Sequence, residues 1–246
     1  MDAPPLAREQ SKAVLKALDG GLETVLGAGD IKIVRADFML SNDDARACIS
    51  RRQDLEAMER DGGARVFLSP SEAVEALRAK DRSIAALSYC WISAEHPSAH
   101  GQAYIMAVRR FLQSGHGTHV VGVFWDYASL PQKPRTGGDA AIFERALGVM
   151  GDIFASVLGT TVIRHRAVAP RPEGLDEASY NDTPYNSRGW TNFESAVSSE
   201  AIARAAFFPS FLEAVEALPP KVSSSRHRWH LLFSSALLLC SSPLFL

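Results

Sequence analysis

Short apolar runs alternate with helical patterns through the middle of the chain. The runs lie at residues 84–90 (IAALSYC), 120–126 (VVGVFWD) and 160–163 (TTVI). Uninterrupted apolar runs of this length are typical of strands covered on both faces, as in a parallel sheet. Residues 101–113 and 142–157 separate the runs, and their patterns favour helices. The pattern predicts an α/β domain in which right-handed crossovers join parallel strands.

The first 80 residues predict a mixed, mostly helical lead-in. Their pattern gives a helix over residues 6–26 that Gly27 and Gly29 would end, a short strand from Asp30, a helix over residues 43–58 and a short strand over residues 65–68. Ser69 is predicted as the N-cap of a further helix, because Pro70 suits the first turn and Glu72 the capping-box position.

A polar loop and a helical pattern over about residues 190–207 follow the third apolar run. We therefore expect three regions. They are an N-terminal extension over residues 1–80, an α/β domain over 81–218, and a Ser-rich basic linker with an apolar tail over 219–246.

The apolar tail has no charged residue between Leu231 and Leu246. As a helix it would reach about 24 Å, short of the roughly 30 Å hydrocarbon core of a bilayer. Arg226 and Arg228 precede it and would suit the cytoplasmic side of a tail anchor. Three interpretations stay open: a membrane anchor, a loosely docked or unstructured tail, and a wrongly predicted coding end.

Composition narrows the function classes without naming one. The 246 residues are 46% hydrophobic, which is typical of a globular protein. Lys and Arg total 26 against 28 Asp and Glu, so no basic excess predicts nucleic-acid binding. The three cysteines form no CxxC pair and no secretory signal is evident, so we expect a cytoplasmic protein without a metal or a resident cofactor.

Polar and aromatic residues gather after the predicted strands. Ligands bind outside the carboxyl ends of the strands in open parallel sheets. Aromatic faces for stacking and carboxylates for hydroxyl groups would suit a sugar or a nucleotide. The candidate binding residues are Tyr89, Trp91, Asp126, Gln132, Arg188 and Trp190, with Glu194 as the candidate catalytic residue.

Four of these segments resemble the heterokaryon-incompatibility (HET) domain family. That family typically shows LSYxWG, WIDxxCINQ, ExxxQVxxM and RxWTxQE in this order. The corresponding segments are residues 87–91 (LSYCW), 124–132 (FWDYASLPQ), 143–150 (FERALGVM) and 188–194 (RGWTNFE). They span close to half of the chain.

Two departures mark the chain as a divergent member: Ile92 replaces the glycine after the tryptophan, and Phe193 replaces the glutamine before the glutamate. HET domains are in turn similar to TIR domains, whose NAD-cleaving members use the glutamate of a WCxxE motif. Trp190 and Glu194 have that spacing and would share a helix face. The resemblance implies a three-layer, TIR- or flavodoxin-like fold, NAD as a substrate and Glu194 as the catalytic carboxylate.

Structural explanations stand beside these roles. Glu194 is also explained as a carboxylate near a helix N-terminus or as the ion-pair partner of Arg188. Asp126 is also explained as the cap of a turn, and the tryptophans as core residues. Arg188 would either orient a carboxylate or bind a phosphate.

Three functional hypotheses follow. The first is a HET/TIR-like signalling or self-defence domain that cleaves NAD when it self-associates. The second is a non-catalytic module that binds copies of itself. The third is an adaptor anchored to a membrane through residues 231–246.

Overall fold

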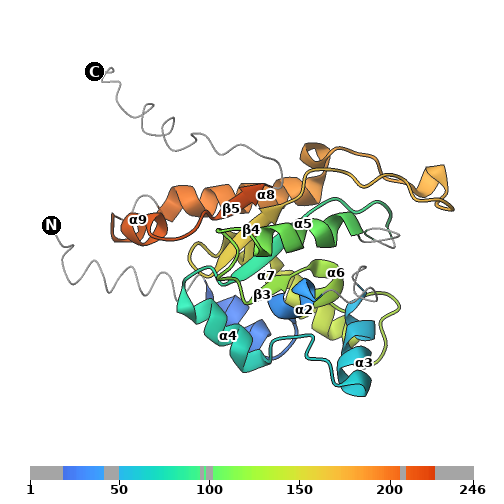
Figure 1. Ribbon diagram of the computed structural model, residues 1–246, viewed down its shortest axis with the longest axis horizontal. Helices are drawn as coiled ribbons and strands as arrows, with labels where there is room; N and C mark the ends of the chain where they lie inside the picture. Colours follow the sequence, from blue (N-terminus) through green and yellow to red (C-terminus); the bar gives the residue numbers. More distant parts are fainter. Residues whose placement is uncertain (1–18, 42–49, 95–96, 98–101, 206–208, 225–246) are drawn as a thin grey trace, which may run out of the picture.

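One sheet of five short strands organises the computed structural model, which describes residues 19–41, 50–94, 97, 102–205 and 209–224 (Figure 1). The elements in chain order are β1 (Val34–Arg35), α2 (Ala36–Leu40), α3 (Arg52–Gly62), α4 (Pro70–Ala79), β2 (Ile84–Ser88), α5 (Gln102–Leu112), β3 (Gly122–Phe124), α6 (Asp126–Ser129), α7 (Asp139–Ala155), β4 (Thr160–Arg164), the 3₁₀ turns η2 (Glu177–Ser179) and η3 (Tyr185–Ser187), α8 (Gly189–Ala205), α9 (Pro209–Glu216) and β5 (Val222–Ser224). The chain therefore has a mixed α/β fold.

The strand order is β1-β3-β2-β4-β5, and β3, β2, β4 and β5 run parallel. In register, Ile84 of β2 lies opposite Gly122 of β3 and Thr160 of β4. Gly122 must lack a side chain, because a Cβ there would come within 2.5 Å of Ile33 Cγ2. The three strands predicted from the apolar runs and the helices predicted between them are confirmed.

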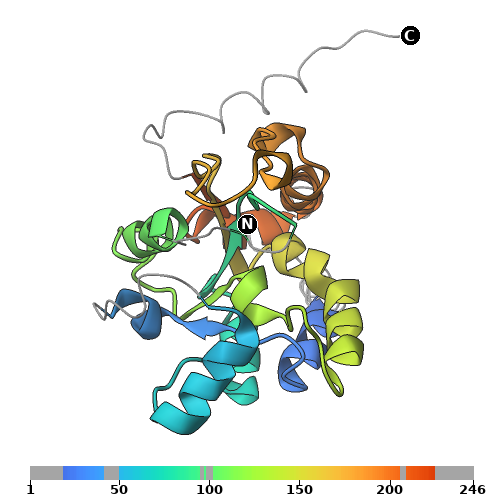
Figure 2. The same cartoon turned by 90° about the vertical axis from the view of Figure 1, so that its right-hand side faces the viewer.

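The strands are covered on both faces. In β2, Ala85 and Leu87 belong to one core cluster together with residues of α5, whereas Ile84 and Ala86 belong to another together with residues of α7. Successive side chains of a strand point to opposite faces of the sheet, so those of a continuous apolar run pack into two cores. Figure 2 shows α5 in green and α7 in yellow-green on opposite sides of the sheet. The apolar helical face predicted over residues 142–157 is thus buried against the sheet apart from Leu147, which is exposed.

The N-terminal extension agrees with expectation only in part. The capping box is confirmed: Ser69 accepts the Glu72 N–H, and Glu72 accepts the Ser69 N–H at 2.8 Å. The strand expected from Asp30 is limited to β1, because α2 begins directly after it, with Asp37 accepting the Phe38 N–H at 2.8 Å.

Two further predicted elements of the extension differ in extent. The strand over residues 65–68 is reduced to one bridge between Phe67 and Val34. The helix expected over residues 43–58 is observed as α3, which begins later, and residues 42–49 lie outside the described part. Residues 19–27 are helical, and Gly29 follows with a φ of +72°, as the expected glycine stop requires.

The sheet crosses both expected region boundaries. β1 pairs with β3 from before residue 80, and β5 pairs with β4 from beyond residue 218. Lys221, directly before β5, stabilises the position of this strand, because its Nζ donates to the carbonyls of Ser156 at 2.6 Å and Thr160 at 2.8 Å. The serine and basic residues around β5 have no apolar pattern that would have predicted a strand.

The proposed tail anchor at residues 231–246 lies outside the described residues. Among the residues that the structure describes, no helix is long and apolar enough to cross a membrane.

Candidate functional site

Three segments meet at the carboxyl end of β2. Ser88, the last residue of this strand, donates its hydroxyl hydrogen bond to Oε2 of Glu194 in α8. The same hydroxyl is hydrogen-bonded to the phenol of Tyr185 in η3. The Ser198 hydroxyl of α8 lies 2.7 Å from the Glu194 carbonyl of its own helix and 3.1 Å from the Phe154 carbonyl of α7, where the two helices meet. A carboxyl group and two hydroxyls are therefore fixed beside the strand end.

Burial dominates the electrostatics of Glu194. Glu194 is 5% exposed, and loss of solvation is the main reason why the pKa of its carboxyl group is raised to about 8. The Asp126 charge contributes to this rise in pKa, whereas the donors Ser88 and Trp190 and the Arg164 charge oppose it. Glu194 is therefore mostly protonated at pH 7 and ionises in the range where a proton can be exchanged easily.

Asp126 has a denser set of donors. It begins α6 and accepts hydrogen bonds from Tyr89 Oη at 2.7 Å, Trp91 Nε1 at 2.9 Å and the Tyr127 N–H at 2.7 Å. Burial still raises the pKa of Asp126. The structure thus brings three predicted site residues together, but the polar atoms of Tyr89 and Trp91 are directed at Asp126.

Gln132 and Arg188 bind main-chain carbonyls. Gln132 Nε2 donates to the carbonyls of Asp126 at 3.1 Å and Leu130 at 2.9 Å, which fixes the loop after α6. Arg188 donates to the carbonyls of Thr183 at 2.7 Å, Asn181 at 2.8 Å and Trp91. Its guanidinium therefore connects the loop before α8 to the segment that follows β2. The ion pair with Glu194 that the sequence left open is not formed.

Trp190 lies at the surface beside the buried carboxyl group. It is 42% exposed, so the expectation that it packs in the core is wrong, whereas Trp125 is fully buried. The ring of Phe193 lies against it at 5.4 Å between centroids, tilted by 33°. The two rings offer an accessible aromatic surface, with Trp190 one helical turn before Glu194 and Phe193 directly before it.

The candidate residues chosen from the sequence leave out three residues of this site: Ser88, Tyr185 and Arg164. Ser88 and Arg164 end the first and third parallel strands, and they are Cα partners across the β2–β4 pair. The signal for both was a polar residue in or directly after a predicted apolar run: Ser88 lies within residues 84–90, and Arg164 follows residues 160–163. Tyr185 reaches the site only through the loop before α8, and its local sequence gives no such signal.

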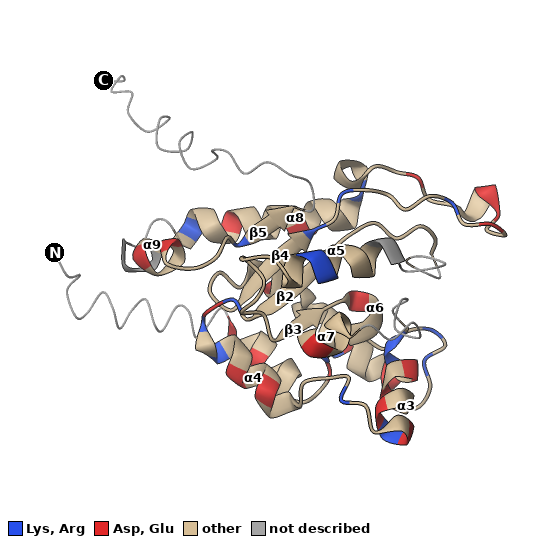
Figure 3. Cartoon of the chain, viewed as in Figure 1, with Lys and Arg blue, Asp and Glu red and all other residues tan. Residues whose placement is uncertain are grey.

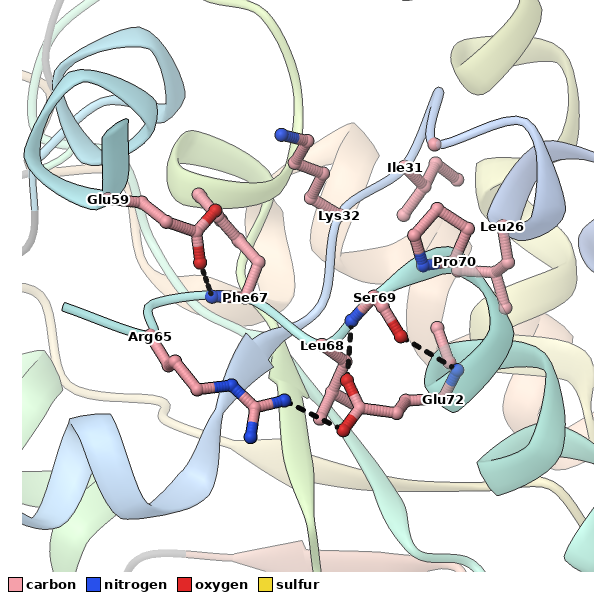
Figure 4. A pocket seen from close by; sticks show the side chains of 12 residues that line it. Leu26, Ile31, Lys32, Glu59, Arg65, Phe67, Leu68, Ser69, Pro70 and Glu72 are labelled. Carbon is pink, nitrogen blue, oxygen red and sulfur yellow. Dashed lines mark hydrogen bonds and ion pairs between the residues drawn. The ribbon is translucent and has the colours of Figure 1, made fainter. Parts of the chain in front are cut away.

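A pocket of about 230 Å³ lies elsewhere, beside the N-terminus of α4 (Figure 4). Its charged side chains are used internally: Glu72 pairs with Arg65 at 2.9 Å, and Glu59 accepts the Val66 N–H at 3.0 Å. Figure 3 shows acidic and basic residues together on α3 and α4, which adjoin this pocket. These bonds stabilise the local fold.

No family model, curated protein or solved structure matches the chain. Among the described residues, no group of three or more His, Cys, Asp or Glu side chains could hold a metal ion. The functional case therefore depends on the residues and contacts of the chain itself.

Proposed function

We propose that this chain is a HET/TIR-like cytoplasmic domain that cleaves the nicotinamide–ribose bond of NAD, with Glu194 as the catalytic carboxylate. The observation that best supports the proposal is the buried Glu194 carboxyl group, held by Ser88 at the carboxyl edge of a parallel sheet. The parallel strands β3-β2-β4-β5 have the order 2-1-3-4 when counted from β2, as in flavodoxin-like folds. We therefore assign the chain to that three-layer class.

The chemistry requires a fixed negative charge. As the C–N bond breaks, nicotinamide leaves with the bonding electron pair and an oxocarbenium-like ribosyl cation develops, as in glycoside hydrolysis. Ionised Glu194 would stabilise that cation and hold the ribose hydroxyls. Water then adds to the anomeric carbon and releases a proton, which gives ADP-ribose, nicotinamide and H⁺.

The remaining candidate residues build the walls of this site. Trp190 would contact the nicotinamide ribose with its exposed ring. Tyr89, Trp91 and Asp126 would shape the opposite wall through their shared hydrogen bonds. Gln132 and Arg188 act as positioning residues, because they fix the loops that follow α6 and precede α8.

A specific observation favours the second candidate, a non-catalytic module that binds copies of itself. Trp190 and Phe193 of α8 and Leu147 of α7 are large apolar residues that are 42 to 44% exposed. Exposed apolar residues on adjoining helices are a common feature of protein interfaces. The two candidates are compatible, because self-association would gate the NAD cleavage that we propose. Membrane attachment through residues 231–246 also stays a proposal.

The deciding experiment measures nicotinamide release from NAD by the full chain, beside E194A, over a range of protein concentrations. The proposal predicts turnover that E194A abolishes and that rises more steeply than the protein concentration. Absence of turnover at every concentration, with concentration-dependent association on a sizing column, would favour the interaction module.

A further inference from the structure

Arg164 lies where the chain connections leave β2 toward opposite sides of the sheet. It ends β4 and is the Cα partner of Ser88, which ends β2. From β2 the chain continues to β3 on one side, and from β3 it returns through α7 to β4 on the other. Crevices that bind ligands lie outside the carboxyl ends of two such strands.

The face of the sheet is also settled by the strand register. Val162 belongs to the core cluster that contains α7, whereas Ile163 belongs to the cluster that contains α5. Alternation then directs Arg164 to the same face as Val162. α8 packs on α7 at that face and supplies Glu194. The Arg164 charge accordingly lowers the pKa of Glu194.

The guanidinium of Arg164 is incompletely bonded. Its Nε is buried, and within the described part of the chain it has no hydrogen-bond partner. Among the described residues, no carboxylate forms an ion pair with Arg164. Arg188, by contrast, donates from all three of its nitrogens to carbonyls. A buried N–H without an acceptor is costly, so an acceptor supplied by a ligand would be favourable.

We propose that Arg164 binds a phosphate group of the substrate, so that the site takes a phosphorylated ribosyl compound with its ribose at Glu194. The planar guanidinium fork matches two phosphate oxygens, and a charge-assisted pair at a partly buried position is strong. This inference rests on the proposed function for the identity of the ribosyl group. The inference adds that the phosphate contact, together with the aromatic rings, lets the site distinguish a dinucleotide from a simple nucleoside.

The test uses ADP-ribose, which carries two phosphates and no cleavable nicotinamide. Calorimetry would compare its affinity for the full-length chain, for R164Q and for R164K, with R166Q as the matched control because Arg166 is exposed two residues later. We expect R166Q to bind as the wild type does. R164Q should bind roughly 10- to 100-fold more weakly, and R164K should lie between them because it keeps the charge and loses the fork.

Affinity of R164Q equal to that of the wild type, or no binding of ADP-ribose by the wild type at millimolar concentration, would overturn the inference. If R164Q fails to fold by circular dichroism, R164K decides, and an affinity equal to the wild type would count against the proposed contact. Nicotinamide release is measured separately. Arg164-dependent binding without release would refute only the enzymatic function, whereas release from NAD with unchanged ADP-ribose affinity in R164Q would refute only the phosphate contact.

Discussion

The carboxyl groups of Glu194, which is buried, and Asp126, which is partly buried, lie at the same edge of the sheet, and consecutive residues donate hydrogen bonds to them. Ser88 donates to Glu194, whereas Tyr89 donates to Asp126. Asp126 accepts two side-chain hydrogen bonds and one main-chain hydrogen bond, so its oxygens are occupied by the protein. Glu194 has hydroxyl and indole neighbours, and an exposed aromatic surface adjoins it.

The difference separates a structural carboxylate from one suited to chemistry. A buried carboxylate that is saturated by donors holds its neighbours in place. A buried carboxyl group with an elevated pKa near the working pH, beside a free surface, has the properties of a functional acid or base. Each of the following predictions would break or sharpen this contrast.

The largest expected effect is on turnover in E194Q. Removing the ionisable group should lower kcat/KM for nicotinamide release by roughly 10²- to 10⁴-fold, the usual contribution of such a group. The amide keeps the shape and an acceptor for Ser88, so the free energy of unfolding should change little below pH 4.5, where Glu194 is protonated in the folded and the unfolded chain. E200Q is the matched control, because Glu200 lies exposed on the same helix and pairs with Arg204 at 2.7 Å. Equal turnover in E194Q and E200Q would refute the assignment.

D126A should act mainly on stability. Truncation leaves the donors of Tyr89, Trp91 and Tyr127 without an acceptor, at a cost of about 1–3 kcal/mol for each buried group. Because the site relaxes in part, we expect a loss of about 2–5 kcal/mol in urea denaturation. A loss below about 1 kcal/mol would show that the Asp126 network is not structural.

Stability should also depend on pH through Glu194. Its pKa is raised from 4.5 to about 8 in the folded chain, so the folded state binds the proton more tightly. The free energy of unfolding therefore decreases as the pH rises from 4.5 to 8. E194Q should lose this part of the decrease, which is on the order of a few kcal/mol. Asp126 contributes in the same direction in both proteins, so parallel curves for wild type and E194Q would contradict the burial of an ionisable Glu194.

The smallest effects distinguish the adjacent pair Ser88 and Tyr89. S88A removes a donor that lowers the pKa of Glu194, so the pH midpoint of turnover should move upward by about one unit. Y89F removes one donor from Asp126 and should cost about 1 kcal/mol of stability while leaving that midpoint in place. Midpoints that shift equally in the two variants would show that the two carboxyl groups form one network.

Much of the fold could be predicted because the apolar runs report burial on both faces. Residues 84–90 and 160–163 contain strands that lie in the interior of the sheet, and their side chains feed two cores. β5 could not be predicted in this way, because it lies at the sheet edge and is held by main-chain pairing and by Lys221. The strand expected from Asp30 is longer than the observed β1, because apolar Ile31 and Ile33 are buried but do not form part of the strand.

Of the candidate site, the two carboxyl groups could be selected from the sequence. Asp126 follows an apolar strand and Glu194 follows Trp190 by one helical turn, so both are marked by local spacing. The partners were not predictable, because Ser88 meets Tyr185 across 97 residues and Glu194 across 106. Arg188 was expected to orient a carboxylate or to bind a phosphate, but it donates to main-chain carbonyls whose positions are set only by the path of the loop.

The most direct test of the central claim is the pH dependence of kcat/KM for nicotinamide release, which reports ionisation in the free enzyme. The wild type should gain about tenfold per pH unit below its midpoint and level off near pH 8, where Glu194 is ionised. E194Q, measured in parallel as the reference, should show only a low and flat rate. A wild-type midpoint near the ordinary glutamate pKa of 4.5, or turnover by E194Q with the same profile, would contradict the claim that buried Glu194 performs the chemistry.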